Sequence, residues 1–156
     1  DGPFSEYGDL AQYKLGVAHS ELRNYEEAVG AFEQLISHYP NSPLVDDARF
    51  QIAMASLKGT FRAGYDQSPT DLAIRELDSF GREYPASELL EDAVDRKEAL
   101  RERRAEHEYR VGRFYERRKR PTAAMTYYEA LVNRYADTSW APKAAERISV
   151  LESTTE

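Results

Sequence analysis

Residues 28–42 read AVGAFEQLISHYPNS, and variants of this phrase recur at residues 73–87 (AIRELDSFGREYPAS) and 124–138 (AMTYYEALVNRYADT). Each copy opens with a small residue, followed four and seven places later by apolar or aromatic residues, which is the spacing of one helix face. The proline of the first two copies cannot continue a helix, and the Ser or Thr two places later is a suitable N-cap for the next helix. The phrase therefore predicts a helix, a sharp stop and a restart, three times over.

The composition is that of a folded helical protein and excludes several kinds of site. Of 156 residues, 41% are hydrophobic and 31% are charged. No apolar run approaches the roughly 18 residues that span a membrane. The sequence has no cysteine, which excludes disulfides and thiolate metal sites. Its net charge of −7 argues against general nucleic-acid binding. The length predicts a single domain over residues 1–156.

The sequence carries no pattern of catalytic residues or metal ligands. It holds no Gly-rich phosphate loop, no His-Glu-x-x-His motif and no nucleophile next to a suitable base. The three histidines, His19, His38 and His107, lie far apart in the sequence. We therefore predict that the chain is not an enzyme and binds neither a cofactor nor a metal.

The first two predicted helices, at about 6–22 and 25–38, obey the spacing of a tetratricopeptide repeat. Leu15-Gly16, Ala28, Phe32 and Pro40 stand at marked positions of this pattern. Gly16 and Ala28 are small because the two helices cross there. We expect an all-α fold, a right-handed solenoid of about three helix pairs at 6–39, 43–84 and 87–135. A C-terminal helix is expected at 139–152.

Two irregularities distinguish the chain from a uniform array of repeats. Eight extra residues fall in the loop at 59–68, which is either an ordered, partner-contacting loop or a tolerated insertion. Fourteen extra residues fall before Gly112 and amount to nearly four helical turns. No Gly or Pro interrupts residues 86–111. We therefore predict one long helix over about 87–118.

A basic segment occupies much of that long helix and the turn after it. Residues 96–120 hold eleven Lys or Arg and five Glu, a local charge of +6 within an acidic chain. The segment is either a docking surface for an acidic partner or an exposed helix with i,i+4 ion pairs. The candidates for partner contact are Arg113, Arg117, Arg118 and Arg120.

The first helix of each pair is expected to line the inner face of the solenoid. The residues predicted on that face are Tyr13, Val17, Phe50, Met54 and Tyr109. They would form an aromatic-lined groove for an extended or helical peptide. The alternative is that the aromatic side chains pack between adjacent helix pairs. Trp140 has the same two interpretations, an interface anchor or a packing residue.

The irregularities and the motifs around them resemble the BamD family. The motifs are Tyr84-Pro-Ala-Ser87, Glu108-Tyr109 and Phe114-Tyr115 on the long helix, and Tyr135-Ala-Asp137-Thr138. Members of this family are lipoproteins of the outer-membrane β-barrel assembly machinery and have five helix pairs. This chain resembles the second to fourth pairs and the first helix of the fifth. We therefore expect a fragment that lacks the first pair and the lipid-acceptor cysteine.

The resemblance implies a non-catalytic periplasmic scaffold, anchored to the outer membrane only through an N-terminal lipid absent from this chain. The implied partners are the periplasmic domains of the BamA barrel, other lipoproteins of the machinery and unfolded outer-membrane protein segments. The family's salt-bridging arginine aligns with Tyr127 here, and Arg117, Arg118 and Arg120 are candidates to supply the charge instead. The alternative function is another tetratricopeptide adaptor, such as a coordinator of cell-envelope division.

Overall fold

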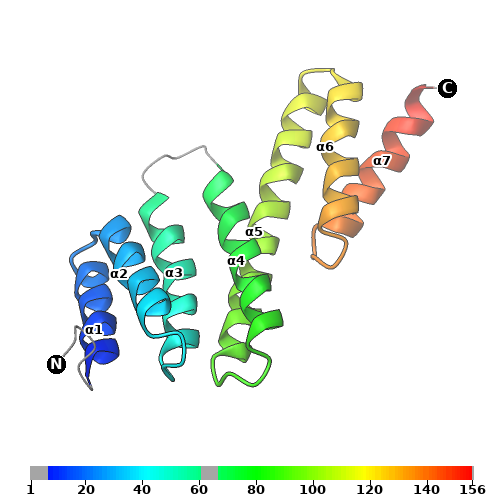
Figure 1. Ribbon diagram of the computed structural model, residues 1–156. Helices are drawn as coiled ribbons and strands as arrows, with labels where there is room; N and C mark the ends of the chain where they lie inside the picture. Colours follow the sequence, from blue (N-terminus) through cyan, green and yellow to red (C-terminus); the bar gives the residue numbers. More distant parts are fainter. Residues whose placement is uncertain (1–6, 61–66, 156) are drawn as a thin grey trace. The chain divides into compact units, whose positions relative to one another are not determined.

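The computed structural model describes residues 7–60 and 67–155, and this part of the chain forms seven α-helices and no strand. The helices are α1 (Gly8–Glu21), α2 (Tyr25–His38), α3 (Val45–Thr60), α4 (Ser68–Glu83), α5 (Leu90–Arg117), α6 (Pro121–Arg134) and α7 (Ala141–Thr155) (Figure 1). The predicted all-α class is confirmed. Residues 61–66 of the predicted loop lie outside the described residues. Among the described helices, none is long and apolar enough to cross a membrane.

Two helix hairpins close at a glycine that faces an aromatic ring. A Cβ atom at Gly16 in α1 would lie 2.5 Å from Cε1 of Phe32 in α2. A Cβ atom at Gly112 in α5 would lie 2.5 Å from Cε1 of Tyr128 in α6. Non-bonded carbon atoms need about 3.5 Å, so no side chain fits at either crossing. This is the predicted reason for a small residue at Gly16.

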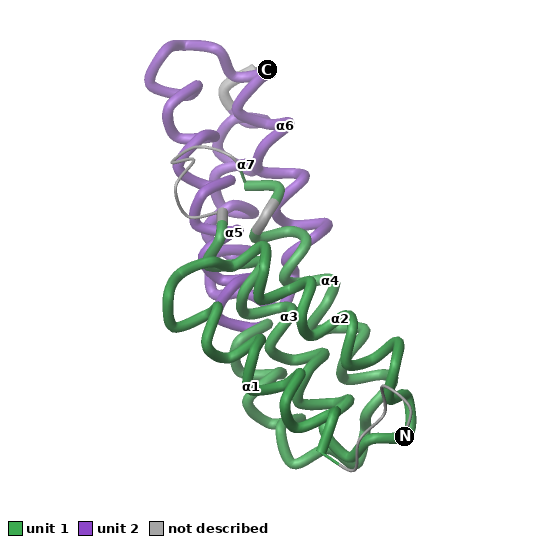
Figure 2. Tube along the Cα trace, turned by 60° about the vertical axis from the view of Figure 1, so that its left-hand side comes forward, with its two compact units in different colours: residues 1–97 green, residues 98–156 purple. Residues whose placement is uncertain are grey.

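The chain divides into two compact units, residues 1–97 and 98–156, with the boundary inside α5 (Figure 2). In the first unit, the buried core joins Ala28, Phe32 and Leu35 of α2 to Ala48, Ile52 and Ala55 of α3. Helix α4 extends this packing, because the rings of Phe50 and Phe80 lie 5.9 Å apart. The prediction that residues 1–156 form a single domain stays a prediction.

The second unit has a core of its own, centred on α6. Tyr128 and Leu131 are fully buried in it. Ala105 of α5 and Ala144 of α7 belong to the same cluster. Helix α7 is therefore held by an apolar face that packs on this core.

A hydroxyl-to-carboxylate hydrogen bond joins the two ends of each hairpin. In the first hairpin, the Ser42 hydroxyl donates to Asp9 at 2.6 Å. The equivalent bonds run from Ser87 to Asp46 at 2.7 Å and from Ser139 to Glu102 at 2.8 Å. In each bond, the donor follows the second helix and the acceptor lies on the first helix of the same pair.

Helix α5 is continuous over 28 residues, as predicted, but it begins at Leu90 and not at 87. The expected N-cap, Ser87, instead stabilises a turn before the helix. Its hydroxyl accepts the N–H of Leu89 at 3.2 Å, and its backbone carbonyl accepts the N–H of Leu90 at 3.1 Å. Ser42 forms the same kind of turn before α3, with the N–H of Leu44 at 3.1 Å. The cap prediction was wrong by about one turn, because the hairpin bond fixes each hydroxyl outside the helix.

Candidate partner-binding site

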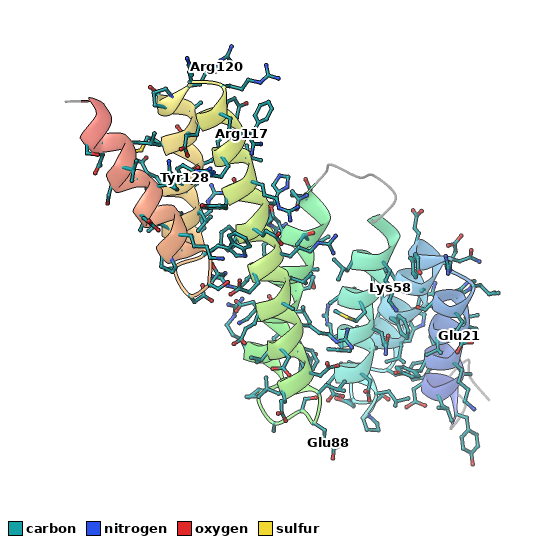
Figure 3. All side chains as sticks on the ribbon, turned by 180° about the vertical axis from the view of Figure 1, so that it is seen from behind. Glu21, Lys58, Glu88, Arg117, Arg120 and Tyr128 are labelled. Atoms are coloured by element: carbon teal, nitrogen blue, oxygen red, sulfur yellow. The ribbon has the colours of Figure 1, made fainter. Side chains whose placement is uncertain are left out.

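The turn between α5 and α6 carries four consecutive cationic side chains at residues 117–120, which we call the basic turn. Arg120 donates its N–H to the carbonyl of Tyr115 at 3.0 Å, and Lys119 donates to that of Glu116 at 2.9 Å. Lys119 has a φ of 56°, in the left-handed region that favours glycine. Arg117 and Arg120 lie at the end of the α5–α6 hairpin (Figure 3). All four side chains of the basic turn are exposed.

The cations upstream of the basic turn are engaged within the chain. Arg96 pairs with Asp92 at 3.0 Å, Arg104 with Glu108 at 2.5 Å, and Arg110 with Glu106 at 2.5 Å. Arg101 reaches Asp137 at 2.5 Å. Within residues 7–60 and 67–155, by contrast, no carboxylate pairs with a cation of the basic turn. The ion-paired interpretation therefore fits these upstream cations, and a docking role for the basic turn stays a prediction.

An aromatic platform supports the basic turn. The guanidinium of Arg118 lies 5.2 Å from the centroid of Phe114, whose side chain is 44% exposed. The ring of Tyr115 meets Phe114 edge-on at 5.4 Å and stacks on Tyr127 at 5.4 Å. Burial, together with the neighbouring Tyr115, raises the pKa of the Tyr127 hydroxyl. Tyr127, predicted as a contact residue, is thus joined to the basic turn through this platform.

Sequence reasoning missed Phe114 and Lys119 as candidate contact residues. The signal was available in part, because Phe114 and Tyr115 directly precede the cationic run. Aromatic and arginine side chains are enriched among residues that dominate protein interfaces. Which of these two rings stays exposed depends on the face of α5 that meets α6: Tyr115 stacks on Tyr127 of α6, whereas Phe114 is exposed.

Arg113, another predicted contact residue, belongs to a network under the platform. Its guanidinium lies 3.3 Å from the carboxylate of Glu116. The Tyr128 hydroxyl donates to the same carboxylate at 2.8 Å, and Arg147 of α7 forms an ion pair with it. One carboxylate therefore joins α5, α6 and α7. Arg113 is less available to a partner than the basic turn, because it already has an internal anion.

The network shifts the pKa values of its members in directions that follow from its contacts. Burial tends to raise the pKa of Glu116, but hydrogen bonds from Arg147 and Tyr128 and the charge of Arg113 outweigh it. The pKa therefore falls below its usual value of 4.5. Burial and the bond to Glu116 raise the pKa of the Tyr128 hydroxyl. The bond to Glu116 also raises the pKa of Arg147. The folded state therefore favours ionised Glu116.

This arrangement predicts an acid-sensitive stability of the second unit. A carboxylate with a depressed pKa stabilises the fold above its unfolded pKa, and the contribution is lost as the pH falls through the folded pKa. The free energy of unfolding should therefore fall from about pH 5 to about pH 3. Glu116→Gln should lower this free energy at pH 7 and flatten its fall in acid. Urea titrations followed by the fluorescence of Trp140, the single tryptophan, measure both effects.

The control for this prediction is Glu146→Gln, the same change at an exposed position of α7. It should leave both the stability at pH 7 and the slope in acid near those of the parent chain. Equal slopes for the parent and Glu116→Gln would contradict the prediction.

In the first unit, the residues predicted to line a peptide groove pack against other helices. Phe50 and Met54 are 5% and 7% exposed, so little of either side chain is accessible. Tyr13 is half-buried, and its ring lies 5.5 Å from that of Phe32. Val17 packs against the same core. These contacts match the packing alternative, and a peptide groove on this face stays a prediction.

In the second unit, Tyr109 is half-buried between two aromatic rings. Its centroid lies 5.7 Å from that of Tyr128 and 5.2 Å from that of Trp140. The ammonium of Lys143 lies 3.9 Å from the centroid of Trp140. Trp140 thus packs on the hairpin that precedes α7, which matches the packing interpretation.

Helix hairpins that cross at a glycine and an aromatic ring, with a sharp turn between successive pairs, define a repeat protein of the tetratricopeptide class. Such proteins bind other proteins along their extended helix surfaces. The chain belongs to the YfiO family of outer membrane lipoproteins, whose family model matches residues 2–152. The BamD resemblance is thereby confirmed.

Curated relatives are named outer membrane protein assembly factor BamD. The relative from Caulobacter vibrioides is 28% identical over 146 residues, covering 94% of this chain and 48% of the relative. The relative from Vibrio cholerae is 28% identical over 154 residues, covering 92% and 64%. The relative from Rickettsia prowazekii is 25% identical over 124 residues, covering 80% and 49%. The chain thus spans about half to two thirds of these relatives.

Proposed function

We propose that this chain is a protein-binding scaffold segment that serves outer-membrane protein assembly. The BamD names of its relatives support the role, and family membership supports a periplasmic location at the outer membrane. The role is non-catalytic, because a scaffold needs a rigid helix surface and no reacting groups. The partners are the periplasmic domains of the BamA barrel, other lipoproteins of the machinery and unfolded outer-membrane protein segments.

The observation that carries the proposal is the basic turn. Four exposed cations follow one another at the end of a helix hairpin, and Arg118 lies over the exposed ring of Phe114. Clustered charges of one sign raise the association rate and select partners of opposite sign. The partner surface should therefore be acidic and should present an apolar group to Phe114. The basic turn is proposed to contact BamA, with Tyr127 and Arg113 contributing from the platform and the network below it.

Charge reversal at the basic turn should weaken binding to the membrane-proximal periplasmic domain of BamA from the same species. Arg117→Glu combined with Arg118→Glu should raise the dissociation constant roughly tenfold or more, because attraction becomes repulsion. Binding by the parent chain should also weaken with added salt. Calorimetric titrations at low and high salt measure both effects.

The matched control is Arg49→Glu combined with Arg75→Glu. It makes the same change in net charge at exposed positions of the first unit. Binding by this variant should stay close to that of the parent. An equal loss in both variants, or binding that does not depend on salt, would contradict a contact at the basic turn.

A further inference from the structure

A cleft of about 770 Å³ opens in the first unit between α2 and α4, over the last turns of α3. Figure 1 shows α3 between these two helices. The apolar lining of the cleft includes Tyr25 and Val29 of α2, Ala55 of α3 and Leu72 of α4. None of the residues predicted for the peptide groove lines it. The volume lies within the range of sites that hold a small ligand or a few side chains.

Gly30 lies in the middle of α2 and lines this cleft. Among the described residues, a Cβ atom placed there would meet no atom within 4 Å, whereas one at Gly16 or Gly112 would collide with an aromatic ring. A glycine inside a helix costs about 0.5–1 kcal/mol relative to alanine. Internal packing gives no reason for this cost at Gly30. The glycine instead keeps one wall of the cleft open.

Carboxylates border the open wall. Glu26 and Glu33 stand on α2 about one turn before and one turn after Gly30, so they share its face. Both are exposed, and no basic side chain among the described residues pairs with either. Exposed carboxylates without an internal cationic partner attract cations.

The two ends of the cleft differ in charge. Arg23 and Lys58 also line it, together with Glu26 and Glu27, and these four residues belong to the end where α2 begins, so their charges offset one another there. A Cβ atom at Gly59 would lie 3.2 Å from Cβ of Tyr25, which places the end of α3 beside the start of α2. Glu33 stands two turns further along α2, about 10 Å from Glu26 along the axis. The end near Glu33 is therefore the acidic one.

We propose that this cleft binds a peptide segment of a protein partner in which an apolar side chain is followed by Lys or Arg. The apolar side chain sits over Gly30 against Val29 and Leu72, and the cation pairs with Glu33. The site is separate from the basic turn and has the opposite charge preference. It gives the chain a second docking surface, on the second helices of successive pairs.

The test uses the capped peptide Gly-Leu-Phe-Lys-Lys and its acidic counterpart Gly-Leu-Phe-Glu-Glu in ¹⁵N-resolved NMR titrations of the whole chain. The basic peptide should shift the amide signals of Gly30 and Gly59, with a dissociation constant in the high micromolar to millimolar range. The acidic peptide should leave both signals in place. Shifts confined to other residues, or equal shifts by both peptides, would overturn the proposal.

Two variants separate binding from folding. Gly30→Leu fills the cleft with a better helix former, so it should keep or raise the melting temperature while abolishing the shift at Gly59. Glu33→Lys should raise the dissociation constant of the basic peptide roughly fivefold. Glu83→Lys on α4 should leave this constant unchanged. Undiminished binding by a folded Gly30→Leu variant would also overturn the proposal. If that variant does not fold, the comparison of Glu33→Lys with Glu83→Lys decides the question.

Discussion

Replacing Tyr128 with alanine is expected to lower the free energy of unfolding by about 4 kcal/mol. The ring is fully buried and occupies the centre of the second unit's core. Its removal leaves a cavity against Gly112, because a glycine has no side chain to fill the space. It also removes the hydroxyl that donates to Glu116 at 2.8 Å. Urea titrations followed by Trp140 fluorescence measure the loss.

The control for this prediction is the adjacent residue. Tyr127 is half-buried and stacks on Tyr115, so Tyr127→Ala should cost only about 1 kcal/mol. The same variant should weaken partner binding, because it removes part of the aromatic platform. Equal losses of stability in Tyr127→Ala and Tyr128→Ala would show that the core is not centred on Tyr128.

Two glycine-to-alanine changes are expected to move stability in opposite directions. Gly112→Ala should destabilise the chain by about 2 kcal/mol, because the new Cβ atom would lie 2.5 Å from Tyr128 and overpacking strains the core. The ring cannot move aside easily while its hydroxyl is bonded to Glu116. Gly30→Ala should instead stabilise it by up to about 1 kcal/mol, because the new methyl group meets open space.

Circular dichroism during urea unfolding measures the free energy of unfolding of both glycine variants. The chemical change is identical, so the difference of about 3 kcal/mol isolates the effect of the surroundings. Two variants that change stability in the same direction would contradict the packing described for Gly112 or the open space described for Gly30.

The repeat pattern predicted the fold because it records contacts within a helix and between neighbouring helices. The distance in sequence between Gly16 and Phe32 is fixed by the last part of α1, one turn and the first part of α2, so the spacing alone identifies the crossing. The continuity of α5 followed equally from local chemistry, because residues 86–111 contain no Gly or Pro. The helix starts were less well predicted. A Ser can cap a helix or stabilise the preceding turn. For Ser87, the hydrogen bond to Asp46, which is 41 residues away in the sequence, favours the turn.

The sequence predicted the charge of the candidate site but not which of its side chains are available to a partner. The cationic run at 117–120 is visible in the sequence, but its availability depends on which cations find internal partners. Arg101 does so with Asp137, and Arg113 with Glu116. The network around Glu116 requires Arg147, which is 31 residues away on another helix. No spacing rule relates these positions. The cleft beside Gly30 was likewise invisible, because its walls come from three helices.

In residues 7–60 and 67–155, the two non-glycine residues with a positive φ are both cations in helix turns, Arg23 with a φ of 62° and Lys119 with a φ of 56°. An L-residue in this conformation costs roughly 1–2 kcal/mol, and glycine is the usual solution. Selection for heat resistance alone would therefore favour glycine at both positions. Lys119 belongs to the basic turn, so glycine there would make the fold more durable while removing one of the four clustered charges. The left-handed lysine therefore marks a trade-off between durability and the proposed recognition, and stabilised versions intended for functional work should keep it.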